Sequence, residues 1–269
     1  MDAIQVLDSA TQLDASARGR VVVCGSHGAL YAAWLAANAR VRALIVNDAG
    51  IGRHSAGIAG VAWLGGLGIP ACAVDYRSAR IADGPDMMAS GVISMANELA
   101  ASLGCLPGHS CIEAAEALAE ATEATAEFEV PEIGETRLRI ANSGHREVWA
   151  LDSVALARAE DRRCVLVTGS HGALLGGRLD DGLLDMDVFA AFFNDAGGGK
   201  DGAGYGRLPG LDARGVAAAT VSCQTARIGD GRSSYDTGVI SRANEAARRL
   251  DLKEGMSVRE AVARLVGLG

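Results

Sequence analysis

The sequence predicts an α/β fold made of two tandem Rossmann-like halves, each a parallel sheet flanked by helices. Two observations predict it. Five short blocks recur in the same order along the chain, and apolar runs alternate with stretches suited to helices. Continuous apolar runs are typical of parallel strands that are buried on both faces. We therefore expect an internal duplication whose two halves are related by a pseudo-twofold axis.

Five pairs of blocks indicate the duplication. In chain order they are LDSA and LDSV, CGSHGAL and TGSHGAL, LIVNDAG and FFNDAG, SARIADG and TARIGDG, and SGVISMANELA and TGVISRANEAA. The spacing is 144 residues between the histidines of the second pair, and 147 between the asparagines of the third. One short insertion explains the change. This period is far longer than a solenoid repeat, so each copy has the size of a small domain.

The blocks divide the chain into three parts. We expect a first α/β repeat at 1–122, a linker at 123–149 and a second α/β repeat at 150–269. The linker contains the run TRLRI, in which apolar and polar residues alternate. Such alternation is typical of a half-buried strand, so the linker is expected to include a β-hairpin.

Each copy predicts the same order of elements. A helix should follow the Asp-Ser pair at 8–9 or 152–153, because these residues cap helices. Three strands are expected in VVVC, VRALIV and PACAV, and in the matching runs CVLVT, DVFAAFF and VAAATV. Helical stretches should separate these strands. The G-V-I-S-x-A-N segment is expected to start another helix, and an amphipathic helix closes the copy.

The composition argues against two kinds of partner. A net charge of −8 and a pI near 5.2 give no attraction to nucleic acid or to an anionic membrane. No signal peptide and no membrane-spanning run is visible, and the six cysteines form no C-x-x-C pair. We therefore expect a cytoplasmic homo-oligomer with a small-molecule substrate.

Three polar motifs, G-S-H-G, N-D-A-G and A-R-I-x-D-G, each begin where an apolar strand stops. Ligands of an open parallel sheet bind beyond the carboxyl ends of its strands. The motifs are therefore expected to converge on one edge of the sheet in each half. This is the predicted site.

Six residues at this edge are candidate catalytic groups. A histidine titrates near pH ~6.5 and suits acid–base chemistry, while a carboxylate can orient it. A lysine in a glycine-rich loop can bind an anion or act as a base when it is desolvated. The candidates are His27, His171, Asp48, Asp195, Lys200 and Asp201.

The candidate substrate-binding residues offer hydrogen bonds and positive charge. Arginine grips a carboxylate with two parallel hydrogen bonds, and glycine lets the backbone approach a ligand closely. The candidates are Ser26, Ser170, Asn47, Asn194, Arg80, Arg227, Asp83, Asp230, Gly84, Gly231 and Tyr235. Each motif also has a structural interpretation: turns for N-D-A-G, helix caps for the serines, and internal salt bridges for the arginines.

Known signatures do not fit. G-S-H-G differs from the G-x-S-x-G elbow of hydrolases, because its serine directly follows the glycine. The run GGGKDG at 197–202 satisfies G-x-G-x-x-G, but it follows the second strand, and its lysine precedes Asp201, so it is not a P-loop. We predict no cofactor, and a divalent metal held by His27, Asp48 and Asp83 stays open as an alternative.

These features favour an enzyme that acts on a small polar or anionic metabolite. The chemistry expected is that of a hydrolase or lyase without a redox cofactor, using histidine acid–base catalysis and anion binding by arginine and backbone N–H groups. Two alternatives stay open. One is a ligand-binding or sensor protein without catalysis, and the other is a nucleotide-binding protein that uses the glycine-rich loops for phosphate.

Overall fold

The structure, a computed structural model, describes residues 3–120, 129–142, 146–178 and 187–267. The chain forms two compact units. The first comprises residues 1–51, 55–134 and 199–201, and the second comprises residues 52–54, 135–198 and 202–269. No helix in the described ranges is both long and apolar enough to cross a membrane.

The first unit contains a five-stranded sheet in the order β1-β2-β3-β4-β5. Strands β1 to β4 are parallel, and β5 pairs antiparallel with β4. Chain order and spatial order are the same, unlike the 3-2-1-4-5-6 order of a doubly wound dinucleotide-binding sheet. The strands are β1 (Ile4–Leu7), β2 (Val21–His27), β3 (Ala43–Asn47), β4 (Ala71–Val74) and β5 (Ile93–Ala96).

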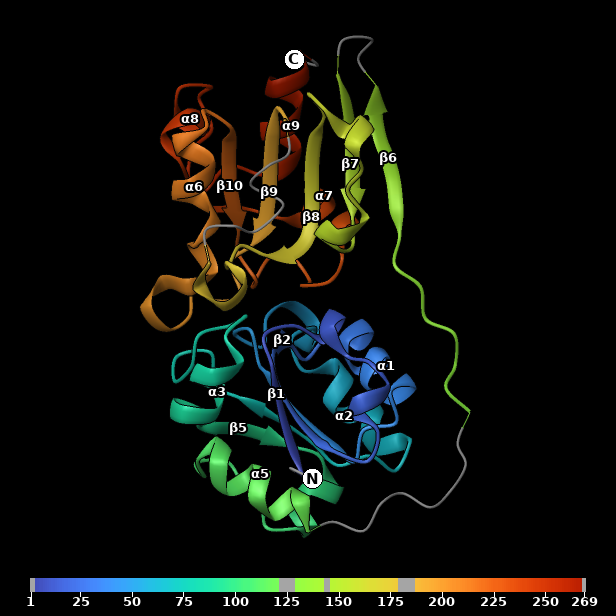
Figure 1. Ribbon diagram of the computed structural model, residues 1–269. Coiled ribbons are helices and arrows are strands. Elements are labelled where there is room, and N and C mark those ends of the chain that lie inside the picture. The colour runs from blue at the N-terminus through green and yellow to red at the C-terminus, as the bar shows by residue number, and fades with distance from the viewer. Residues whose placement is uncertain (1–2, 121–128, 143–145, 179–186, 268–269) are drawn as a thin grey trace. The chain divides into compact units, whose positions relative to one another are not determined.

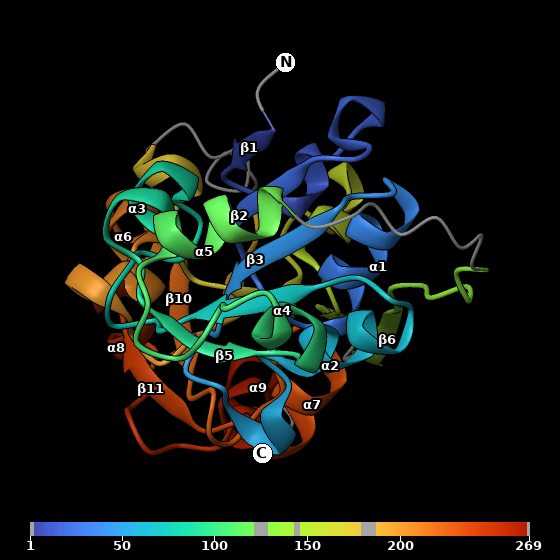
Figure 2. The ribbon, with the colours of Figure 1, turned by 90° about the horizontal axis from the view of Figure 1, so that it is seen from below.

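Helices cover both faces of this sheet (Figure 2). Successive residues of a strand point to opposite faces, so each buried strand contributes side chains to two apolar cores. Val22 packs in one apolar core with α1 and α2, and its neighbour Val23 packs in another with α3 and α5. The helices are α1 (Leu30–Asn38), α2 (Ala59–Gly66), α3 (Gly84–Ser90), α4 (Glu98–Ser102) and α5 (Cys111–Ala119), with 3-10 helices η1 (Ala10–Gln12) and η2 (Ala15–Ala17). The 3-10 helix η3 (Arg53–Ser55) begins with two residues of the second unit and ends in the first.

The second unit contains a six-stranded sheet in the order β11-β10-β9-β8-β7-β6 (Figure 1). Strands β7 to β10 are parallel, whereas β6 and β11 pair antiparallel with their neighbours. The strands are β6 (Arg137–Asn142), β7 (Glu147–Leu151), β8 (Val165–His171), β9 (Ala190–Asn194), β10 (Ala217–Val221) and β11 (Ile240–Ala243).

Leu166 of β8 and Phe193 of β9 pack with α6 on one face of this sheet, and Val167 and Phe192 pack with α9 on the other. The helices are α6 (Arg207–Ala213), α7 (Gly231–Thr237), α8 (Glu245–Arg248) and α9 (Val258–Val266), with 3-10 helices η4 (Val154–Leu156), η5 (Ala159–Asp161) and η6 (Leu175–Gly177). The 3-10 helix η8 (Lys200–Tyr205) begins with two residues of the first unit and continues in the second. The predicted α/β class is confirmed, as two mixed and mostly parallel sheets flanked by helices. The matching order of elements in the two units is compatible with duplication.

Two predicted elements differ from the structure. The Asp-Ser pairs start only the single 3-10 turns η1 and η4, since the chain becomes extended again at Leu13 and Ala157. The G-V-I-S segments form the edge strands β5 and β11, and the helices α4 and α8 begin only after Asn97 and Asn244. Within the expected linker, 123–128 and 143–145 lie outside the described residues.

Asn97 explains why this block recurs. Its Oδ1 accepts the Ala100 N–H at 3.0 Å and so caps α4, while its Nδ2 donates to Val61 O at 3.1 Å and Ile69 O at 3.0 Å. Asn244 makes the matching contacts in the second unit. One buried amide therefore fixes the end of an edge strand against the preceding helix and loop.

Replacing Asn97 by alanine should lower the free energy of unfolding by about 2 kcal/mol, because a helix cap and two buried hydrogen bonds are lost. Urea-induced unfolding measures this. Asn38→Ala is the matched control, since the exposed Asn38 donates to the Trp34 carbonyl of its own helix. Equal stability of the two variants would contradict the bracing role of Asn97.

Candidate functional site

The three polar motifs of the first unit meet at the carboxyl edge of its sheet. G-S-H-G ends β2, N-D-A-G follows β3, and A-R-I-x-D-G lies between β4 and α3. The Ala82 N–H donates to Gly25 O at 2.7 Å, and the Gly28 N–H donates to Asn47 O at 3.0 Å. Backbone hydrogen bonds therefore join the three loops directly.

The second unit repeats this arrangement. The Gly229 N–H donates to Gly169 O at 2.8 Å, and the Gly172 N–H donates to Asn194 O at 2.9 Å. The Asn194 Nδ2 donates to Ala226 O at 3.3 Å. The same motif positions thus carry the same loop-to-loop contacts in both units.

The motif glycines allow this close approach. A Cβ at Gly25 would lie 2.6 Å from the Asp83 backbone nitrogen, and one at Gly84 would lie 2.4 Å from a carbonyl oxygen at the end of β1. Gly231 is equally crowded, with a carbonyl oxygen 2.3 Å from its Cβ position. Close packing of loops accounts for these glycines, including the predicted substrate-binding pair Gly84 and Gly231.

The asparagine and aspartate of N-D-A-G are buried and brace the loops. Asn47 Oδ1 accepts the Ala49 N–H at 2.9 Å, and Asp48 Oδ1 accepts the N–H groups of Gly50 and Tyr76, both at 3.0 Å. Burial raises the pKa of Asp48, and these hydrogen bonds oppose the rise. Asn194 and Asp195 make the matching contacts. These four side chains hold the loops in place from within.

Both N-D-A-G loops make a left-handed turn. Ala49 and Ile51 have φ values of 50° and 61°, and Ala196 has a φ of 47°. A left-handed conformation costs a non-glycine residue about 1–2 kcal/mol. Strain of this kind gathers at functional sites, where the surrounding structure maintains it. The alanine of N-D-A-G has this strained conformation in both units, which marks both loops as candidate functional sites.

The serines and histidines of G-S-H-G face different partners. Ser26 Oγ accepts the Ala10 N–H at 2.9 Å, and Ser170 Oγ accepts the Val154 N–H at the same distance, so each serine anchors the 3-10 helix that precedes its strand, η1 or η4. His27 Nδ1 accepts the Ala29 N–H at 3.3 Å. His171 Nδ1 likewise accepts the backbone N–H two residues on, at 3.3 Å. Both rings are partly exposed.

Burial lowers the pKa of His27 to about 4. The ring is therefore neutral at pH 7. Since its Nδ1 accepts a hydrogen bond, the proton of the neutral ring lies on Nε2. Such a histidine is a hydrogen-bond donor at neutral pH and a weak base.

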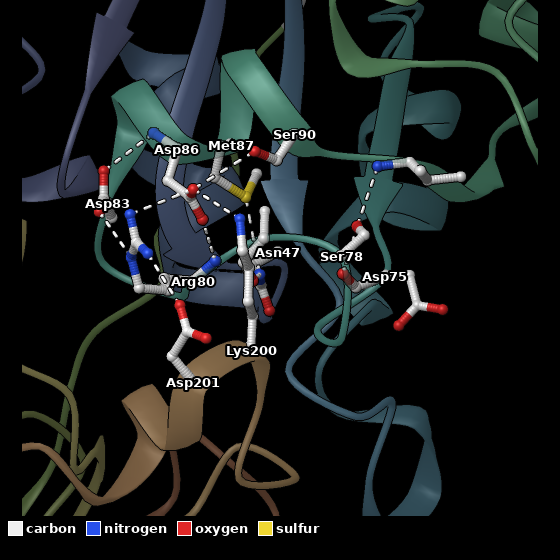
Figure 3. A network of polar contacts seen from close by, with 12 residues as sticks. Asn47, Asp75, Ser78, Arg80, Asp83, Asp86, Met87, Ser90, Lys200 and Asp201 are labelled. Carbon is white, nitrogen blue, oxygen red and sulfur yellow. Dashed lines mark hydrogen bonds and ion pairs between the residues drawn. The ribbon is translucent and has the colours of Figure 1, made fainter.

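Ion pairs engage the predicted arginines. Arg80 contacts Asp83 at 3.1 Å and Asp86 at 3.1 Å (Figure 3). In the second unit, Arg227 contacts Asp230 at 2.5 Å. The hydrogen bond to Asp83 is the main cause of the raised pKa of Arg80. The arginines of both units thus form internal salt bridges, as the structural interpretation of this motif expects.

Lys200 and Asp201, which belong to the first unit, complete this network (Figure 3). Lys200 Nζ lies 2.7 Å from Asp86 Oδ1, and Asp201 Oδ2 lies 2.9 Å from Arg80 Nη1. Burial alone would raise the pKa of Asp86, but hydrogen bonds from the Arg80 backbone and from Lys200 lower it. Two cations and three carboxylates therefore pair with one another here, with one negative charge in excess. The predicted Tyr235 lies elsewhere, on α7, with the Arg259 guanidinium 5.1 Å from its ring centre.

Sequence reasoning missed two bracing carboxylates. Asp8 Oδ1 accepts the Gly84 N–H at 3.0 Å, and Asp152 Oδ1 accepts the Gly231 N–H at the same distance. The recurrence of the L-D-S block was the available signal. It was interpreted only as a helix cap, because the partner glycines are 76 and 79 residues away.

The carboxyl edge of the second unit also contains a cavity of about 310 Å³. It is lined by Thr136, Leu138, Ala150, Asp152, Gly229, Asp230 and Arg232. Next to it, burial and the neighbouring Asp152 raise the pKa of Glu135 to about 7, although a hydrogen bond with Ser153 opposes the shift. Of the predicted site residues, Asp230 lines this cavity. Glu135 and Thr136 were not predicted, since they lie in the expected linker.

Among the described residues, no group of three or more His, Cys, Asp or Glu side chains is placed to hold a metal ion. His27, Asp48 and Asp83 therefore do not form a ligand set in this geometry. No protein-family model matches the chain, and neither a curated protein nor a solved structure matches it.

Proposed function

We propose that the protein is an enzyme of the hydrolase or lyase type that acts on a small polar or anionic metabolite without redox chemistry. The observation that carries the proposal is the state of His27, a neutral donor at the end of β2 among three interlocked loops. His171 occupies the matching position in the second unit. Substrate would bind at the carboxyl edge of the sheet.

The proposed role of His27 follows from its tautomer. A neutral imidazole with its proton on Nε2 can donate to a substrate oxygen that gains negative charge in the transition state. The hydrogen bond from Ala29 fixes the ring orientation, so little reorganisation is needed during the reaction. Such stabilisation suits the cleavage of an amide, lactam or ester, or the loss of a proton beside a carboxylate. None of these reactions transfers electrons to a cofactor.

Non-catalytic ligand binding is the second candidate, and one observation favours it. The carboxylates Asp48 and Asp83 and the guanidinium of Arg80 already bond within the protein, so a conventional acid–base pair is not assembled. We do not propose that the glycine-rich loop binds phosphate, because N–H groups of this loop are engaged. The N–H groups of Gly197 and Gly198 already donate to Asp195.

Turnover of a panel of small amides, lactams and carboxylates tests the proposal. For any substrate that is converted, His27→Asn should lower kcat by about a hundredfold, the usual cost of losing one oxyanion donor. Asparagine keeps an acceptor for the Ala29 N–H and removes the Nε2 donor. His171→Asn tests the second unit in the same way, and the exposed His109→Asn is the control.

The same panel separates the two candidates. A compound that raises the melting temperature but is never converted would replace the enzyme proposal with ligand binding. If both His27→Asn and His171→Asn kept full turnover, the assignment of the histidines would be wrong.

A further inference from the structure

The cavity of the second unit lies between the β6–β7 pair and the A-R-I-x-D-G loop that leads into α7. Thr136, Leu138 and Ala150 line it from the strand pair, and Gly229 and Asp230 line it from the loop. With a volume of about 310 Å³ it falls at the lower end of the range of small-molecule pockets. The matching edge of the first sheet has no counterpart of β6 among its described strands.

Two carboxylates with remaining acceptor capacity line this cavity. Asp152 accepts the N–H groups of Gly231 at 3.0 Å and Thr136 at 2.7 Å. Asp230 accepts the Ser233 N–H at 2.6 Å and pairs with Arg227. A carboxylate offers about four lone-pair sites, so each can accept a further hydrogen bond from a ligand.

The electrostatics around the cavity favour a cation. Glu135 lies next to Asp152, and the raised pKa of Glu135 records burial and repulsion from that carboxylate. An ammonium ion placed beside the two groups would relieve the repulsion. Among the described residues that line the cavity, Arg232 is the one cationic side chain, and its charge is already paired because its Nε lies 2.5 Å from Asp236 Oδ2.

The remaining walls favour a short apolar body. Leu138, which is 39% exposed, supplies aliphatic surface next to the carboxylates, and the buried Ala150 pairs with it across the two strands. A ligand with an ammonium group at one end and a few methylene groups at the other would match both kinds of wall. Burying those methylene groups contributes about 0.8 kcal/mol each.

We propose that this cavity is a binding site for a small primary amine, with its ammonium group at Asp152, in the field of the neighbouring Glu135, and its aliphatic chain against Leu138. The site goes beyond the proposed function, because it uses neither His27 nor His171. It belongs to the second unit alone.

Titration of the full chain with n-butylamine at pH 7.5, followed by calorimetry and by methyl NMR, tests this inference. Saturable binding is expected, with shifts of the Leu138 and Ala150 methyl signals. The uncharged n-butanol and the anionic butyrate are the matched ligands and should not bind. Asp152→Asn and Glu135→Gln should each weaken butylamine binding about tenfold. The first removes a charge-assisted hydrogen bond to the ammonium group, and the second removes a negative charge close to it.

Several results would overturn the inference. They are no saturable binding of butylamine, equal binding of butanol, or unchanged affinity in both variants. Asp75→Asn, which removes a carboxylate of the first unit that pairs with Arg77, controls for a general effect of charge. Glu135→Gln keeps the test decisive if Asp152→Asn fails to fold, since Asp152 also braces the backbone. Loss of turnover in the histidine variants with intact amine binding would leave this site independent of the proposed enzyme activity.

Discussion

Replacing Gly169 by alanine is expected to destabilise the second unit by about 4 kcal/mol or more, the range of the most damaging single substitutions. A Cβ at this position would lie 2.2 Å from the Asp230 backbone nitrogen and 2.7 Å from the Asp152 carbonyl oxygen. Because the three nearest atoms are all backbone atoms, no rotamer change can relieve the clash. The three loops that meet here would have to separate.

Chemical unfolding monitored by circular dichroism measures this effect, together with the yield of soluble protein. Gly66→Ala is the control, since a Cβ at this last residue of α2 meets nothing within 4 Å. That variant should be equally stable or gain about 0.5–1 kcal/mol from the better helix former. Gly25→Ala should behave like Gly169→Ala in the first unit. Native stability of the Gly169→Ala protein would show that the loops do not approach as described.

His27 should make the first unit less stable in mild acid. Its pKa is near 6.5 in an unfolded chain and about 4 in the folded protein. Between these values the unfolded chain binds more protons, so the free energy of unfolding falls as the pH decreases from 6.5 to 4. The full difference corresponds to about 3 kcal/mol, an upper bound because the ring is partly exposed.

Urea-induced unfolding at several pH values between 4 and 7.5 tests this dependence. His27→Asn should remove the part of the slope that His27 causes, while His109→Asn, which removes an exposed histidine, should keep it. An unchanged slope in His27→Asn would mean that the imidazole is protonated as easily in the folded protein as in the unfolded one. The donor role proposed for the neutral ring would then lose its basis.

The central strands could be predicted because they are buried on both faces and therefore consist of continuous apolar residues. The edge strands could not. Residues 92–95 have the sequence V-I-S-M and lie just before Asn97, the N-cap of α4. From the sequence, the helix is expected to begin at this segment, but it begins only after Asn97. Only pairing with β4, where Ala73 lies opposite Met95, decides that this segment is extended. Such long-range pairing leaves no local pattern.

The candidate site was predictable in its location but not in its chemistry. The carboxyl ends of parallel strands must share an edge, so the meeting of the motifs follows from the fold class. Protonation states follow from burial, which the sequence does not display. The low pKa of His27 and the raised pKa of Glu135 depend on neighbours from distant segments, and the second depends on Asp152, 17 residues later in the chain.

The position of β1 at the edge of the first sheet affects how newly made chains can associate. Strand β1 pairs with β2 alone among the described strands, so it forms an edge of that sheet. Its sequence, IQVL, contains no charged residue, whereas the edge strand β6 carries Arg137 and Arg139. Charged side chains discourage pairing between the edges of neighbouring molecules, and a short strand limits it. A nascent chain on a crowded polysome would therefore depend on the brevity of β1, only four residues, to avoid joining the sheets of its neighbours.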